Sequence, residues 1–174
     1  MDTRGEEMTR AESRAWESLL VASQLLWAAM DARLTKDVDL ALFEYRILAA
    51  IHCEPMGIVR IKHLAELTTS TLPRMSKALS RLEARGLIRR SRCAGDARAT
   101  NVQLTDQGRA TLDQAAAAHL DEARHLLLDQ LTENQLDQLA DLLAPASVRL
   151  NGGEPWHVEH VHPAIGNVVT GAGE

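Results

Sequence analysis

Apolar residues recur three and four positions apart over most of this chain, which is the period of an amphipathic helix. The longest such stretch covers about residues 10–35. It opens with a capping box, Thr9-Arg10-Ala11-Glu12, whose hydroxyl and carboxylate can bond the first free backbone N–H groups. Further helices are predicted at about 41–53, 62–68, 73–85, 106–131 and 132–145, with a very short extended segment at 58–61. A Leu- and Ala-rich chain with 3% aromatic residues suits this mainly α-helical fold class.

Two short segments, 87–91 and 100–104, lose the helical period and are predicted as the strands of a two-stranded β-wing. The loop between them, 92–99, contains the turn signal Gly95-Asp96. Helix, three-residue turn, helix and hairpin then follow one another in the order of a winged helix-turn-helix.

The apolar patterns divide the chain into four regions. The terminal helices carry Leu and Ala stripes that are larger than one small helical module needs to cover, so we expect them to form a homodimer. The tail holds five Gly, two Pro and three His after residue 150, without a long apolar pattern. The predicted regions are an N-terminal dimerisation helix (1–35), a winged helix-turn-helix (36–105), C-terminal dimerisation helices (106–148) and a flexible tail (149–174).

Positive charge is concentrated in one segment of a chain that is acidic overall. Residues 60–98 hold 10 of the 19 Lys and Arg but only 3 of the 24 Asp and Glu, which gives this segment +7 and leaves −12 for the rest. A basic cluster of this kind is typical of a nucleic-acid-binding module. The turn-helix-hairpin order inside it favours double-stranded DNA over a merely solvated surface.

The second helix of a helix-turn-helix presents its N-terminal residues to base edges in the major groove. Here those residues are mainly hydroxyls and cations, which can bond bases and phosphates. At the hairpin tip, Arg98 is expected to enter the minor groove and Asp96 to hold the loop in shape. For Arg81, pairing with Glu83 is an alternative to phosphate contact. The predicted DNA contacts are Lys62, Ser70, Thr71, Arg74, Ser76, Lys77, Arg81, Asp96 and Arg98.

Several motifs together resemble the MarR family of bacterial transcriptional regulators, over about residues 35–145. The specific part is the wing pattern Asp96-x-Arg98 followed by Leu104-Thr105-x-x-Gly108. The segments 64–67 and 76–90 add Leu-Ala-Glu-Leu and Ser-Lys-Ala-Leu-Ser-Arg-Leu-Glu-Ala-Arg-Gly-Leu-Ile-Arg-Arg. The resemblance implies a helical dimer that acts, as a repressor or an activator, at a palindromic operator and is often released by a small ligand. It also implies wing roles for the Asp and Arg and DNA contacts at the start of the recognition helix.

Other side chains suggest sensing. His157, His160 and His162 have a spacing at which imidazoles can bind Zn²⁺ or Ni²⁺. Cys93 lies near several arginines, which lower a thiol pKa and favour a reactive thiolate. A metal- or thiol-responsive sensor of the same fold therefore stays open. Trp16 and Trp27 are expected in the dimer contact or beside an effector.

Other classes are less compatible with the sequence. No nucleophile elbow, phosphate loop or acid–base pair is present, so we do not expect an enzyme. A winged-helix module that binds only proteins would not need the +7 segment. No apolar run approaches the roughly 20 residues of a membrane span, and the acidic N-terminus is unlike a secretory signal. We therefore expect a cytoplasmic protein. The sequence establishes no cofactor, and Zn²⁺ at the tail histidines is the one candidate.

Overall fold

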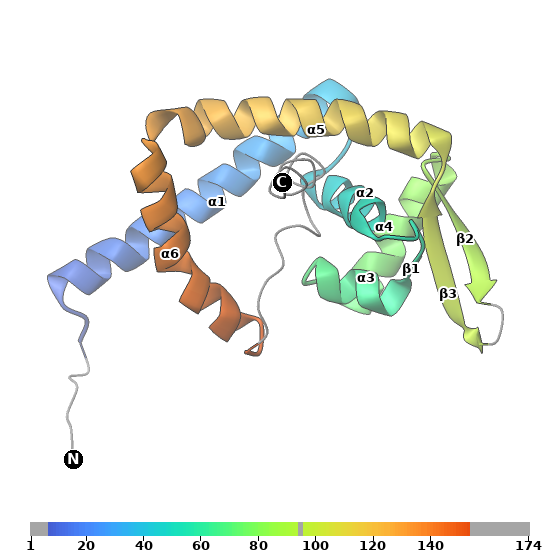
Figure 1. The fold of residues 1–174 in the computed structure, drawn as a ribbon, viewed down its shortest axis with the longest axis horizontal. Helices are drawn as coiled ribbons and strands as arrows, with labels where there is room; N and C mark the ends of the chain where they lie inside the picture. Colours follow the sequence, from blue (N-terminus) through green and yellow to red (C-terminus); the bar gives the residue numbers. More distant parts are fainter. Residues whose placement is uncertain (1–6, 94–95, 154–174) are drawn as a thin grey trace, which may run out of the picture.

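The computed structural model describes residues 7–93 and 96–153 and confirms a mainly helical protein (Figure 1). The long helix α5 runs along α1, and α6 turns away from its end. The helices α2, α3 and α4 gather with a small sheet toward the other end of α5. The elements are α1 (Arg10–Val38), α2 (Leu42–Cys53), β1 (Val59–Arg60), α3 (Ile61–Leu67), α4 (Leu72–Ala84), β2 (Ile88–Cys93), β3 (Asp96–Leu104), α5 (Asp106–Leu126), the 3-10 helix η1 (Leu128–Gln130) and α6 (Glu133–Leu150).

Side-chain caps define where the long helices begin. The capping box at Thr9 is confirmed: its N–H donates to Glu12 Oε2 at 2.7 Å, and its hydroxyl accepts from Glu12 N at 3.2 Å. A second capping box opens α6 at Thr132. The predicted end of α1 near residue 35 was too early, because the helix continues to Val38 and ends at Asp39 with φ +51°.

One hydrophobic core joins α1, α2, α4, α5 and the sheet. Its side chains come from the apolar faces that the helical period predicted, and α2 is almost entirely buried within it. The largest fully buried side chains are Tyr45, Leu34, Leu40, Ile47, Leu48, Ile51, Leu64, Met75, Leu79, Leu82, Leu112 and Val102. The core therefore fixes the place of α4 relative to α1 and α5.

The sheet has three antiparallel strands in the order β1-β3-β2, so the short segment expected at 58–61 adds a strand to the wing. The predicted loop over 92–99 was too long. Arg92 is paired with Thr100 and Cys93 with Asp96, with a register irregularity between Arg92 and Cys93. These strand ends are polar, so they lack the alternation of apolar and polar residues from which a strand is predicted. A hairpin that projects into solvent does not need that alternation.

The C-terminal helices also differ from the prediction. The expected helix over 106–131 ends at Leu126 and is followed by η1. Helix α6 continues through Pro145 to Leu150 instead of stopping there. A proline removes one backbone donor but does not remove the hydrogen bonds on either side of it, so a helix can continue at a cost. Within the described ranges, no helix is both long and apolar enough to cross a membrane.

The wing is joined to the helical body by a compact junction. Thr105, the N-cap of α5, donates from its N–H to Leu87 O at 3.1 Å and from its hydroxyl to Gly86 O at 2.6 Å. The same hydroxyl accepts from Gly108 N at 3.0 Å. A Cβ atom on Gly108 would lie 1.9 Å from Leu87 O. This close approach is the physical reason for the Leu-Thr-x-x-Gly pattern.

Candidate nucleic-acid interface and an apolar pocket

The turn between α3 and α4 is held by the backbone and by hydroxyl groups. Ser70 N donates to Ala65 O at 2.9 Å, and the buried Thr68 hydroxyl donates to Leu64 O at 2.8 Å. Thr71 is the N-cap of α4 and accepts from Arg74 N at 3.4 Å. The turn therefore delivers the first residues of α4 to the surface in a defined conformation.

Helix α4 has one buried and one exposed face. Its buried residues are Met75, Ala78, Leu79 and Leu82, as predicted from their spacing. The predicted contacts Ser76 and Lys77 lie on the exposed side, near the exposed N-cap Thr71. Lys77 has no ion-pair partner among the described residues, so its ammonium group is available to an anion.

Two predicted arginine contacts lie on the flank of α4 that faces α2. The Arg74 guanidinium carbon stands 4.1 Å from the centre of the Phe43 ring, in cation–π contact. The Arg81 Nε donates to Glu44 Oε1 at 2.8 Å. Arg74 remains at the N-terminal end of α4, whereas the Glu44 pair accounts for Arg81 without DNA. The sequence had offered Glu83 as that partner.

Glu83 pairs with a different arginine. Arg90 of β2 reaches it at 3.1 Å through Nε and donates to Ser80 Oγ at 2.9 Å through Nη2. These contacts fasten the base of the wing to α4. The exposed Lys62 of α3 lies 4.0 Å from Glu66.

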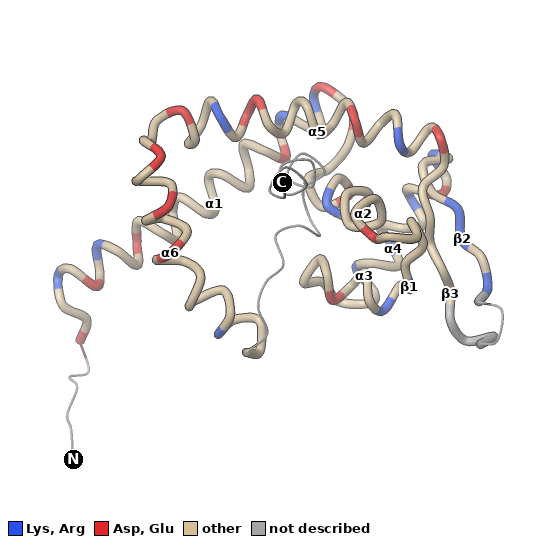
Figure 2. Tube along the Cα trace, in the orientation of Figure 1, with Lys and Arg blue, Asp and Glu red and all other residues tan. Residues whose placement is uncertain are grey.

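The tip of the wing is only partly described. Asp96 and Arg98 fall on β3 next to the hairpin turn, but their side chains and that of Cys93 lie outside the described part of the chain. Figure 2 shows basic positions along β2 and around α3 and α4, while acidic positions mark the bend from α5 into α6 at the opposite side. The basic residues between 60 and 92 thus lie on β1, α3, α4, β2 and the turn after α4.

An apolar pocket of about 430 Å³ lies between α1, α2 and α5. Trp27 and Met30 line it from α1, Arg46 from α2 and His119 from α5. The Arg46 guanidinium carbon is 5.5 Å from the centre of the Trp27 ring. His119 stacks on Tyr45, with 4.8 Å between ring centres. Trp27 therefore lies in the wall of this pocket.

Arg46 is the polar feature of this pocket that sequence reasoning missed. Burial and the nearby charge of Arg74 lower the pKa of Arg46. No carboxylate pairs with it within the described residues, although a half-buried cation normally has an anionic partner. The available signal was a single Arg inside the apolar run 42–51.

The predicted metal ligands His157, His160 and His162 lie outside the described residues. Within the described ranges, no group of three or more His, Cys, Asp or Glu side chains is arranged to hold a metal ion.

Comparisons with known proteins point to one family. A sequence model described as MarR family matches residues 36–99. Sco3205, a MarR family transcriptional regulator from Streptomyces coelicolor solved in complex with DNA, is 30% identical with a TM-score of 0.81, over 86% of this chain and 93% of that one. AbsC from the same organism is 27% identical with a TM-score of 0.80, over 85% and 99% of the two chains. BldR from Sulfolobus solfataricus is 25% identical with a TM-score of 0.67, over 80% and 99%. No curated protein sequence matches significantly.

Proposed function

The chain belongs to the MarR family, and on that premise we propose that it is a homodimeric repressor that binds palindromic operators and is released by an effector. The family consists of transcriptional regulators, not enzymes. The observation that carries DNA binding is the exposed N-terminal half of α4, which presents hydroxyls and Lys77, a cation without an ion-pair partner among the described residues. The relative Sco3205, crystallised with DNA, supports the same reading. Selection of bound duplexes from a random pool tests it.

The proposed contacts divide into readers and positioning residues. Thr71, Arg74, Ser76 and Lys77 would face base edges or phosphates, because the N-terminal residues of a recognition helix enter the major groove. Lys62 and Ser70 would touch phosphates beside them. Arg98 would enter the minor groove at the wing tip, and Asp96 would shape that tip.

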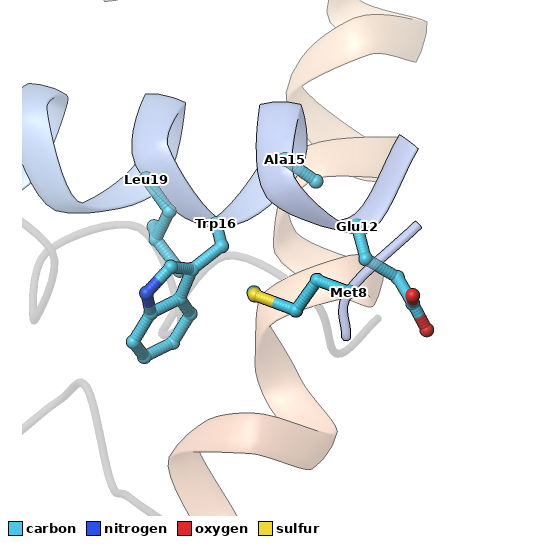
Figure 3. Close-up of a pocket in the computed structure, with 5 residues that line it drawn as sticks. All are labelled: Met8, Glu12, Ala15, Trp16 and Leu19. Carbon is cyan, nitrogen blue, oxygen red and sulfur yellow. The ribbon is translucent and has the colours of Figure 1, made fainter. Parts of the chain in front are cut away.

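Two regions, α1 and α5–α6, are proposed as the dimer body, and 36–105 as the DNA-binding region. From Leu19 to Met30 only Ser23 and Gln24 are polar, and a helix that is apolar all round is normally buried. Yet residues 14–28 are all exposed in the single chain, and Leu25 retains 65% of its surface. An open pocket of about 420 Å³ lies at the start of this helix. Its lining residues include Met8, Trp16 and Leu19 (Figure 3). A second copy is the occupant that covers such a surface in full.

Replacing Leu20 by glutamate in the full chain should shift the protein from dimer to monomer, because a carboxylate cannot be buried unpaired in an apolar contact. Sedimentation velocity at micromolar concentration measures the change. Met56→Glu is the matched control, since it replaces an exposed apolar side chain by the same carboxylate in the turn between α2 and β1, outside both proposed dimer regions. A Leu20→Glu protein that sediments like the wild type would contradict the proposed interface.

The pocket at Arg46 is the proposed effector site. Its apolar walls and single cation suit a small apolar monoanion, and benzoate is the probe. Benzoate should weaken binding of the selected duplex, whereas neutral benzamide should not. Arg46→Gln should abolish the benzoate effect and keep DNA binding. An equal response of Arg46→Gln and wild type, measured by fluorescence anisotropy, would place the effector elsewhere.

A further inference from the structure

Glu44 is the only buried carboxylate among the described residues, with 4% of its surface exposed. It lies in the first turn of α2, inside the apolar run that forms the centre of the core. A buried carboxylate is costly unless hydrogen bonds and a counter-charge compensate it. The counter-charges come from α4 and its C-cap: Arg81 Nε donates to Glu44 Oε1 at 2.8 Å, and Arg85 Nη1 lies 3.7 Å from Glu44 Oε2. Ala41 N, at the start of α2, donates a further hydrogen bond to Glu44 Oε2 at 3.3 Å.

The same corner also holds the end of α1. Asp39, which caps α1, lies 3.4 Å from Arg85 Nη2. Leu42 N, the first residue of α2, donates to Asp31 Oδ1 of α1 at 2.8 Å. The proposed dimerisation helix α1 and the recognition helix α4 are thus connected through ion pairs of Arg81 and Arg85 with Glu44 and Asp39. The hydrogen bond from Leu42 to Asp31 joins α2 to α1 at the same corner.

We propose that Glu44 is a positioning residue that sets the angle of α4 relative to α1, and with it the separation of half-sites that the dimer accepts. This rests on the proposed function as a DNA-binding dimer. Apolar packing between helices tolerates small slides, whereas charge-assisted hydrogen bonds are directional. Arg81 in this arrangement holds the recognition helix and does not contact phosphate.

The test compares spacing preference in the full-length protein. Anisotropy gives the Kd for the selected operator and for the same duplex with two base pairs inserted between its half-sites. The spacing preference is the Kd for the lengthened duplex divided by the Kd for the selected operator. Glu44→Gln keeps the side-chain size and removes the charge. The ratio should fall about tenfold, which is about 1.4 kcal/mol, while the affinity for the lengthened duplex stays the same or rises.

Glu66→Gln is the matched control, because it removes the same charge from the neighbouring α3, where Glu66 pairs with Lys62 at the surface. Its ratio should equal that of wild type. Arg81→Gln should reproduce the Glu44→Gln ratio and leave the salt dependence of binding unchanged. If Glu44→Gln does not fold, Arg81→Gln carries the same test, since the Arg81 side chain is 51% exposed.

Different results separate the two proposals. If wild type selects and binds no duplex, the proposed function fails. If wild type binds and both variants keep its spacing preference, only the positioning role is overturned. A lower salt slope in Arg81→Gln would also overturn it, because Arg81 would then contact a phosphate directly.

Discussion

Gly108→Ala should unfold at a temperature about 6–12 °C below wild type, as a loss of about 3 kcal/mol predicts for a chain of this size. The new Cβ would lie 1.9 Å from Leu87 O and 2.9 Å from Leu87 C, which are backbone atoms that no rotamer change can move. To make room, α5 must separate from the link between α4 and β2 that contains Leu87. The hydrogen bonds from Thr105 to Leu87 and Gly86 would stretch at the same time. Thermal melting followed by circular dichroism measures the shift.

The sign of this effect is informative. Alanine is preferred over glycine within a helix by about 1 kcal/mol, so without the contact the substitution would stabilise the protein. Arg109→Ala at the next, exposed position of α5 is the control and should melt close to wild type. A Gly108→Ala protein as stable as wild type would show that α5 does not approach Leu87 this closely.

Arg98→Ala should weaken binding of the selected operator by about tenfold, within the range that a specific contact contributes. The reason is the loss of a cation that we place in the narrow, electronegative minor groove. Each phosphate that is no longer neutralised reduces the slope of log K against log salt by about 0.9, so the slope should become shallower by about that amount. Anisotropy at several salt concentrations measures both quantities, and the melting temperature should not change.

Two further variants separate charge from shape at the wing. Lys36→Ala removes an exposed cation from α1, outside the basic segment 60–98, and should leave affinity and slope unchanged. Asp96→Ala should weaken binding by loosening the hairpin, so higher salt should not erase its difference from wild type. If Arg98→Ala binds as tightly as wild type at every salt concentration, the wing does not read DNA in this protein.

Local signals predicted much of the fold. Thr9 and Thr132 opened helices because a hydroxyl and an acceptor three residues later satisfy free N–H groups, and the structure has both boxes. Gly86 ended the recognition helix with φ +73°, as its place in the sequence indicated. The buried face of α4 followed from spacing alone. Such features depend on neighbours within about one helical turn, so the sequence contains them directly.

The features that the sequence did not predict depend on contacts between segments that are far apart in the chain. Glu44 and Arg81 are 37 positions apart, and nothing local says that this carboxylate, rather than Glu83, receives Arg81. Arg46 is a candidate ligand contact because Trp27 of α1 lies beside it, and that neighbour is 19 positions away in the sequence. Helix α6 continues through Pro145 although proline disfavours a helix interior. The free energy that the proline costs is offset by the rest of the helix.

The most direct measurement of the central claim is the salt dependence of binding to a duplex selected from a random pool. We predict enrichment of an inverted repeat whose half-sites lie about one helical turn apart. If each protomer neutralises two phosphates, the slope of log K against log salt should be about −3.6 or steeper. A pool that enriches no duplex, or a slope near zero, would contradict the assignment of α4 and the wing as the DNA-binding surface.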